Sequence, residues 1–221
     1  MSSPPQSTNQ IRQVGQIGID ESGKGDYFGP LVIAGVFATP EQERQLKAAG
    51  VRDSKTLSDA KATSLSAQIR TTCRHTLVVI GPERYNSLHS SFKNLNRLLA
   101  WGHARAIENL LEQVSCDRVI ADQFGDERFL QNALMAKGRS VRLIQKPRAE
   151  EEIVVAAASI VARAEFLRRL QELSSRYGVS LPKGASDSVI MAGKVFVQKH
   201  GADALGQVAK LHFRTTERVL G

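Results

Sequence analysis

The chain has 221 residues, little cysteine and no long apolar run. Its two cysteines, Cys73 and Cys116, lie in unrelated contexts without C-x-x-C spacing, so nothing indicates a disulfide framework or a zinc site. No segment approaches the roughly 18 apolar residues that a membrane-spanning helix needs. Residues 1–13 lack the apolar centre of a signal peptide and are predicted to form a disordered tail. We therefore expect a cytoplasmic protein with no membrane partner.

Basic residues outnumber acidic residues. Lys and Arg total 30 against 22 Asp and Glu, which gives a net charge of +8. Such a balance favours a polyanionic partner, although many basic proteins bind no nucleic acid. The charge therefore indicates a class of partner, and only a matching binding site in the sequence would support that partner.

Strand-like and helix-like segments alternate over residues 14–180, the expected core. Apolar, β-branched segments predict strands over 14–20, 31–38, 75–82, 117–124 and 140–147. Apolar residues spaced by three and four predict helices over 54–72, 95–111, 127–138 and 150–178. This order predicts an α/β sheet with helices packed on it. Residues 181–221 are basic and are expected to form a helical C-terminal region packed on the core.

The segment GIDESGKGDYFGP, residues 18–30, places two acids before a Gly-Lys-Gly sequence. Its spacing matches the G-x-x-x-x-G-K part of a P-loop, which would indicate a nucleotide-binding ATPase. A P-loop continues with Ser or Thr, whereas this chain has Gly25, and the carboxylates of Asp20 and Glu21 would repel phosphate. Two anions beside a phosphate are favourable only with a cation between them. The segment therefore predicts a metal-dependent site for phosphate chemistry.

Further acids follow other predicted strands. Functional side chains of α/β sheets gather beyond strand ends, which gives the candidate set Asp20, Glu21, Asp122 and one of Glu150, Glu151 and Glu152. Acids at a helix start also complement the helix dipole, and Asp122 also fits a turn or cap. Two like charges about 4 Å apart repel by roughly 4 kcal/mol at an effective dielectric near 20, so a cluster needs a cation. Oxygen ligands without His or Cys select Mg²⁺ or Mn²⁺, and two such ions can promote phosphodiester hydrolysis.

Seven segments lie in order within residues 14–216: GIDESGKGDYFGPLVIAGV, RDSKTLS, NLNRLLAWGHARAI, VIADQF, PRAEEEIVVAAASIVARAEFL, LPKGAS and VAKLHFRTT. Together they resemble the type 2 ribonucleases H, and ribonuclease HIII more closely than ribonuclease HII. The resemblance implies a ribonuclease H-like fold, with a mixed central sheet flanked by helices and a helical C-terminal region. It also implies two-metal cleavage of the RNA strand of RNA/DNA hybrids, with Mg²⁺ or Mn²⁺, leaving 3′-hydroxyl and 5′-phosphate ends.

The family's metal site consists of an Asp-Glu pair after the first strand, an Asp after a later strand and a fourth acid, typically Glu in ribonuclease HIII. The resemblance places these catalytic roles on Asp20, Glu21, Asp122 and Glu150, and the acids beside Glu150 leave the fourth position open. The family's G-x-G loop contacts the hybrid through its backbone, whose groups can read a ribose 2′-hydroxyl. The candidate substrate-binding residues are Gly23, Lys24, Gly25, Tyr27, Ser54, Lys55, Lys146 and Arg148.

Other family-like positions have plain structural interpretations. The small residues 156–159 are typical of close helix packing on a sheet, and His103 is typical of a packing or hydrogen-bonding role. Lys210, His212 and Arg214 are interpreted as surface charges.

The sequence differs from the family at its start. Ribonuclease HIII typically carries an N-terminal substrate-binding domain, and residues 1–16 alone precede the catalytic motif here. Two other functions stay open: ribonuclease HII-like cleavage at single ribonucleotides embedded in duplex DNA, and a nucleic-acid-binding module without catalysis. The protein is expected to act as a monomer.

Overall fold

A computed structural model describes residues 14–221, and the expected tail over residues 1–13 lies outside this part. The described chain is built around a mixed five-stranded sheet with strand order β3-β2-β1-β4-β5. β1 pairs antiparallel with β2 and parallel with β4, β2 pairs antiparallel with β3, and β4 pairs parallel with β5. The strands are β1 (Gln16–Ser22), β2 (Leu31–Ala38), β3 (Arg74–Ile80), β4 (Arg118–Asp122) and β5 (Arg142–Lys146).

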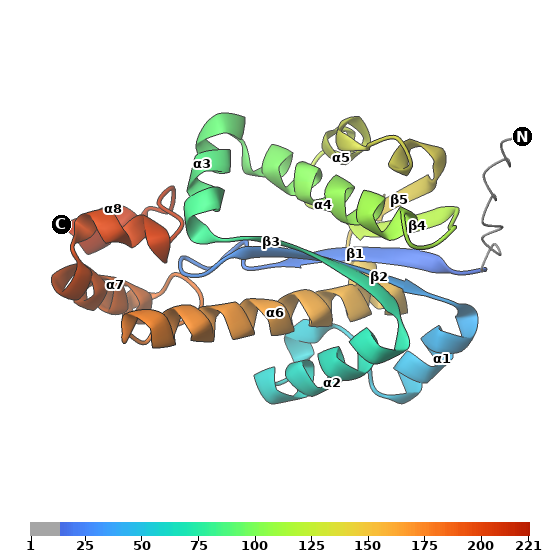
Figure 1. Ribbon diagram of the computed structural model, residues 1–221, viewed down its shortest axis with the longest axis horizontal. Coiled ribbons are helices and arrows are strands. Elements are labelled where there is room, and N and C mark those ends of the chain that lie inside the picture. Colours follow the sequence, from blue (N-terminus) through green and yellow to red (C-terminus); the bar gives the residue numbers. More distant parts are fainter. Residues whose placement is uncertain (1–13) are drawn as a thin grey trace, which may run out of the picture.

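Helices cover both faces of the sheet (Figure 1). In that view α3, α4 and α5 lie above the sheet, whereas α1, α2 and α6 lie below it, and α7 and α8 gather at the end that holds the C-terminus. The helices are α1 (Pro40–Ala48), α2 (Asp59–Thr72), α3 (Pro82–Phe92), α4 (Leu95–Leu111), α5 (Arg128–Ala133), α6 (Ile153–Tyr177), α7 (Asp187–His200) and α8 (Thr215–Leu220). Short 3₁₀ turns are η1 (Ser54–Thr56), η2 (Gly138–Ser140), η3 (Ala149–Glu151) and η4 (Ala202–Gln207). Along residues 14–221, no helix combines the length and apolarity that a bilayer span requires.

The two faces of β2 lie in two separate hydrophobic cores. Every residue of β2 is buried, and side chains alternate across a strand with a period of two. Val32 and Ala34 therefore pack in the core that contains α2 and α6, whereas Leu31 and Ile33 pack in the core that contains α4. The continuous apolar sequence of this strand is explained by burial on both sides.

Helix α6 packs on β1 at very short range because β1 has a glycine at the contact. A Cβ placed on Gly18 would lie 2.2 Å from the backbone carbon of Val154. Ala156, Ala157 and Ala158 follow on α6 and are fully buried, which confirms that these small residues allow close packing. Gly18 pairs with Val36 inside the sheet, so the residue that suggested the start of a P-loop is a packing residue of a strand.

The structure differs from the predicted elements in several places. Helices α1 and α3 were not predicted; α1 buries only Leu46, so its sequence lacks an apolar period. Its start was nonetheless visible, because Thr39 forms a capping box with Gln42. The helix expected from residue 54 begins at Asp59, since the preceding residues form η1. The helix expected over 150–178 begins at Ile153 for the same reason: η3 precedes it.

Candidate functional site

The predicted acids gather at one cleft of about 490 Å³. β1 and β4 are parallel neighbours, so their carboxyl ends meet at the same edge of the sheet. Asp20 and Glu21 lie in the last residues of β1, and Asp122 is the last residue of β4. Glu150 comes from η3, just before α6, and lines the same cleft, as do Asp26 and Asp53. Chain segments far apart in sequence thus supply the four predicted carboxylates to one cleft.

The geometry separates Glu150 from its two acidic neighbours. Glu150 lines the cleft with a side chain that is 17% exposed, and its Oε1 lies 3.5 Å from Nζ of Lys55. Glu152 instead accepts a 2.6 Å bond from Nζ of Lys146, and Glu151 is exposed. Arg148 has a left-handed backbone with φ of 54°, and the turn that follows it directs these three acids differently. Glu150 is therefore the acid of this group that the structure places beside the other three.

Asp20 is held in an environment that disfavours its charge. Burial raises the pKa of Asp20 well above its usual value, and the nearby charges of Glu21 and Asp122 raise it further. A hydrogen bond from Ser159 and the backbone N–H of Glu21 oppose the shift. Asp20 is therefore a buried carboxyl group with two acidic neighbours.

Glu21 is stabilised as an anion from two sides. Burial works to raise its pKa, but the hydrogen bond and charge of His103, followed by Lys24, outweigh burial and lower the pKa to about 2. Nε2 of His103 lies 2.9 Å from one carboxylate oxygen, and Nζ of Lys24 lies 2.9 Å from the other. His103 is fully buried on α4, where its ring packs edge-on against Phe124. The expected hydrogen-bonding role of His103 is confirmed, and its partner is one of the candidate catalytic acids.

Asp122 is fixed by the backbone of the turn that carries Glu150. The N–H of Ala149 donates to Oδ1 of Asp122 at 3.1 Å. Burial raises the pKa of Asp122, the bond from Ala149 opposes this, and the charges of Glu150 and Glu21 raise it again. This shared environment shows that the acids of the cleft act on one another electrostatically.

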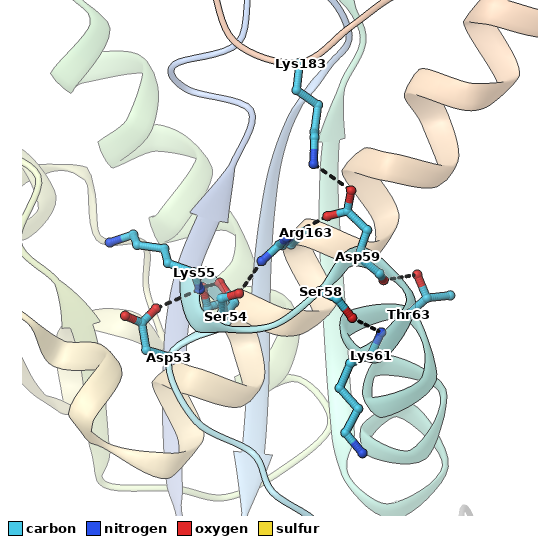
Figure 2. A network of polar contacts seen from close by, with 10 residues as sticks. Asp53, Ser54, Lys55, Ser58, Asp59, Lys61, Thr63, Arg163 and Lys183 are labelled. Atoms are coloured by element: carbon cyan, nitrogen blue, oxygen red, sulfur yellow. Dashed lines mark hydrogen bonds and ion pairs between the residues drawn. The ribbon is translucent and has the colours of Figure 1, made fainter.

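A polar network joins the turn 53–56 to α2 and α6 beside the cleft (Figure 2). Oγ of Ser54 lies 2.8 Å from Oγ of Ser159 on α6, and the guanidinium of Arg163 donates to the carbonyl oxygen of Ser54. Figure 2 shows that Arg163 and Lys183 both reach Asp59, to which they donate at 2.6 Å each. The network fixes the turn 53–56 on α6, so that Lys55 extends from it with a 79% exposed side chain.

The two glycines of Gly-Lys-Gly have different structural reasons. Gly23 has φ of 90°, and a Cβ there would lie 2.2 Å from the carbonyl oxygen of Pro30, so the turn itself requires glycine. Around Gly25, by contrast, a Cβ would meet no atom within 4 Å, and its φ is not in the left-handed region. Both glycines and Lys24 line the cleft. The fold therefore explains why residue 23 is glycine. At Gly25 no part of the protein requires glycine, and its backbone is accessible from the cleft.

Three predicted substrate-binding residues lie elsewhere. Tyr27 is fully buried against Phe28, and its hydroxyl accepts from Thr216, so it is a core residue. Lys146 is paired with a neighbouring acid, and Lys146 and Arg148 are not among the residues that line the cleft. Lys146 and Arg148 were inferred from sequence proximity and Tyr27 from the family resemblance; Tyr27 is buried in the core, and Lys146 ends β5 paired with Glu152.

Several residues of the cleft were missed or were given only a packing role. Ser159 and Arg163 lie four residues apart on α6, so they share a helix face, and this spacing was the available signal. Lys183 also lines the cleft and pairs with Asp59, which lies outside the lining; the two come from distant segments, and no pattern in sequence joins them. The cleft is therefore richer in basic groups than the motifs alone indicated.

The chemistry of the acidic side suits Mg²⁺ or Mn²⁺. Among residues 14–221, no three Asp, Glu, His or Cys side chains are grouped closely enough, as arranged in this structure, to hold a metal ion. All four predicted carboxylates are hard oxygen donors. Burial raises the pKa values of Asp20 and Asp122, and the charges of neighbouring acids raise them further, so a divalent cation would be favourable beside them. The residues present therefore fit such ions.

Comparison with known proteins agrees with this geometry. The profile described as Ribonuclease HII matches residues 17–216. Ribonuclease HIII of Protochlamydia amoebophila is 48% identical over 214 residues, which are 97% of this chain and 71% of that protein. Ribonuclease HIII of Chlamydia pneumoniae is 45% identical over 207 residues, which are 92% of this chain and 70% of that protein.

A solved structure extends the agreement to the fold. The crystal structure of Bst-RNase HIII in complex with Mn²⁺ superposes with a TM-score of 0.87 at 33% identity, covering 96% of this chain and 70% of that one. The ribonuclease H-like fold expected from the sequence is confirmed, as is the resemblance to ribonuclease HIII. The chain belongs to the ribonuclease HII family.

Proposed function

We propose that the chain is a metal-dependent endoribonuclease that cuts the RNA strand of RNA/DNA hybrids and leaves 3′-hydroxyl and 5′-phosphate ends. One observation carries the proposal: the four predicted carboxylates, from separate segments, line a cleft that also holds basic side chains, in a chain of this family. The carboxylates would bind a divalent ion, and the basic side chains of the cleft would attract the phosphates of the strand to be cut. The arrangement suits phosphodiester hydrolysis in a polyanion.

The four carboxylates would act together as ligands of the metal ions. Asp20 and Asp122 end the two central parallel strands, so they are candidates to share a cation, and Glu21 and Glu150 flank them. Divalent ions bound there would activate a water and stabilise the leaving oxygen of the phosphodiester. The buried Glu21 is kept as an anion by His103 and Lys24, and a cation bound to it would take the place of Lys24 beside one carboxylate oxygen. The backbone N–H of Ala149 orients the Asp122 carboxylate.

The substrate side would use backbone groups at Gly25 and cations around it. A side chain at Gly25 would meet nothing in the protein, so the missing side chain is best explained by close approach of a sugar-phosphate backbone. Lys24, Lys55 and Lys183 line the same cleft and suit neighbouring phosphates. Backbone groups can recognise a 2′-hydroxyl, which is both donor and acceptor and marks RNA.

We further propose that the protein acts as a monomer in the cytoplasm. All four carboxylates come from one chain, so the site does not need a second copy. Cys73 and Cys116 are buried free thiols, as expected in a reducing compartment. Light scattering on the eluting peak of a sizing column would test the first statement, and a dimer would contradict it.

The test of the reaction is cleavage of two labelled duplexes, each in Mg²⁺ and in Mn²⁺: a long RNA/DNA hybrid and a DNA duplex with one ribonucleotide. Cutting of the hybrid into 5′-phosphorylated products supports the proposal. Efficient cutting at the single ribonucleotide would instead support the ribonuclease HII-like alternative. The matching family profile, described as Ribonuclease HII, is compatible with that alternative. Binding of both duplexes with no cleavage would leave the non-catalytic module as the better account.

A further inference from the structure

Lys210 is a cation that the proposed catalytic site does not use, and it is fully buried. Its Nζ donates to the carbonyl oxygens of Asp26 at 2.7 Å and Gly29 at 2.8 Å, and the carbonyl oxygen of Phe28 lies at 3.4 Å. The ammonium also lies 5.6 Å from the centre of the Tyr85 ring, where a cation is favourable. The interpretation of Lys210 as a surface charge is therefore wrong.

The backbone around Lys210 is bound to the same turn. The N–H of Lys210 donates to the carbonyl oxygen of Tyr27 at 2.9 Å. The N–H of Gly29 donates to the carbonyl oxygen of Val208 at 2.9 Å. Residues 208–210, near the end of the chain, thus run beside the turn that follows Gly-Lys-Gly.

That turn determines where Gly23 and Gly25 lie. The left-handed Gly23 packs against the carbonyl of Pro30, which closes the turn on itself. The N–H of Asp26 donates to the carbonyl oxygen of Gly23 at 3.4 Å, and Oδ1 of Asp26 accepts from the N–H of Gly184 at 2.7 Å. The three carbonyl groups that accept from Lys210 belong to residues 26, 28 and 29, so they lie in the same turn, between Gly23 and Pro30. A shift of the turn would therefore displace the open backbone at Gly25.

A buried ammonium is a costly way to fill this space. Burial lowers the pKa of Lys210 to about 7, and only the charge of Asp26 opposes the shift. A methionine of similar length would fill the volume without that cost, but it would leave the carbonyl oxygens without their donor. What the ammonium adds is therefore a fixed orientation of three backbone groups in the turn.

We propose that Lys210 is a positioning residue for substrate binding, which fixes the turn 26–29 so that the backbone at Gly23–Gly25 is preorganised for the sugar-phosphate backbone of the hybrid. The inference rests on the proposed function. Preorganisation reduces the ordering cost that binding must overcome, so its loss raises KM more than it lowers kcat. The contacts of Lys210 are with the turn and not with the four carboxylates, so metal affinity should not depend on it.

The test compares Lys210→Met with Lys194→Met. Lys194 is exposed on α7, so its variant removes the same charge by the same substitution without touching the turn. KM and kcat are measured on a labelled RNA/DNA hybrid, Mn²⁺ affinity by titration calorimetry, and folding by thermal unfolding. Hybrid affinity is measured by fluorescence anisotropy with each substitution combined with Asp122→Asn, which prevents cleavage.

Lys210→Met should raise KM and the hybrid Kd about tenfold, with Mn²⁺ affinity unchanged and kcat within about threefold of the original. Lys194→Met should match the original chain in all four quantities. A folded Lys210→Met variant with unchanged KM would overturn the proposal, and so would an equal loss of Mn²⁺ affinity. If the original chain cleaves neither duplex, the proposed function itself fails, which is a different result from an unchanged variant of an active enzyme.

A second variant decides the question if Lys210→Met does not fold. Asn86 on α3 donates to the carbonyl oxygens of Gly206 and Ala209 and accepts from the N–H of Leu211. Asn86→Ala loosens the segment that carries Lys210 and leaves the ammonium in place. A raised KM with unchanged Mn²⁺ affinity supports the proposal, and an unchanged KM overturns it.

Discussion

Alanine at Gly23 and alanine at Gly25 should have different effects, although only Lys24 separates them. The structure gives Gly23 an internal reason to be glycine and gives Gly25 none. Gly23→Ala should therefore reduce stability, whereas Gly25→Ala should reduce hybrid binding and leave stability intact. The pair separates a folding requirement from a substrate requirement within one motif.

The magnitudes follow from the local geometry. At Gly23, a left-handed alanine costs about 1–2 kcal/mol, and the contact of its Cβ at 2.2 Å from the Pro30 carbonyl oxygen adds about 1–3 kcal/mol. A total near 3 kcal/mol lowers Tm by roughly 6–12 °C in a chain of this size. At Gly25, alanine meets open space, so Tm should stay within about 2 °C or rise slightly.

The binding assay is fluorescence anisotropy of a labelled hybrid with cleavage blocked by Asp122→Asn. Loss of one close backbone contact at Gly25 costs about 1.4 kcal/mol, which is a tenfold rise in Kd. Differential scanning calorimetry gives Tm for both variants. A Gly25→Ala variant that binds the hybrid as tightly as the original chain would refute the assignment of this backbone to the substrate.

Three further results are expected. Gly18→Ala should lower Tm by roughly 5–10 °C in calorimetry, because its Cβ would push α6 from β1; an unchanged Tm would contradict the close packing. Lys55→Ala should reduce the slope of log Kd against log salt by about 1 if Lys55 contacts a phosphate, and an unchanged slope would exclude that contact. Hydrogen bonds from Arg168, and then the bonds and charge of Arg169, lower the pKa of Glu165. Its contribution to stability is therefore complete above the ordinary glutamate pKa and is lost as pH falls through the lowered value. The Tm deficit of Glu165→Gln at pH 7 should shrink near pH 3, whereas a constant deficit would contradict this.

The acids at strand ends were predictable from sequence because strand signals are local. Asp20, Glu21 and Asp122 each follow an apolar segment directly, and parallel strands bring such ends together. Glu150 was less certain, because the choice among three adjacent acids depends on a 3₁₀ turn after the left-handed Arg148. The backbone conformation of this turn decides which of the three acids faces the cleft.

Contacts between distant segments were beyond the sequence. Tyr27 stands beside a substrate-like motif, yet it is buried by residues near the C-terminus that no local pattern indicates. Lys210 shows the reverse error: the sequence suggested a surface charge, whereas the side chain is buried and donates to carbonyl oxygens within residues 26–29. The pairing of Arg163 with Ser54 likewise depends on how α6 lies against the turn 53–56. Sequence motifs do not predict such contacts, because they depend on packing between segments far apart in the chain.

The central claim is that the acids of this cleft perform the cleavage, and Asp122→Asn tests it most directly. The measurement is single-turnover cleavage of a labelled RNA/DNA hybrid in Mn²⁺ and in Mg²⁺, with hybrid binding measured on the same preparations. The account predicts a rate loss of more than about 100-fold, with hybrid Kd within about threefold of the original. A folded Asp122→Asn variant that cuts the hybrid at the original rate would contradict it.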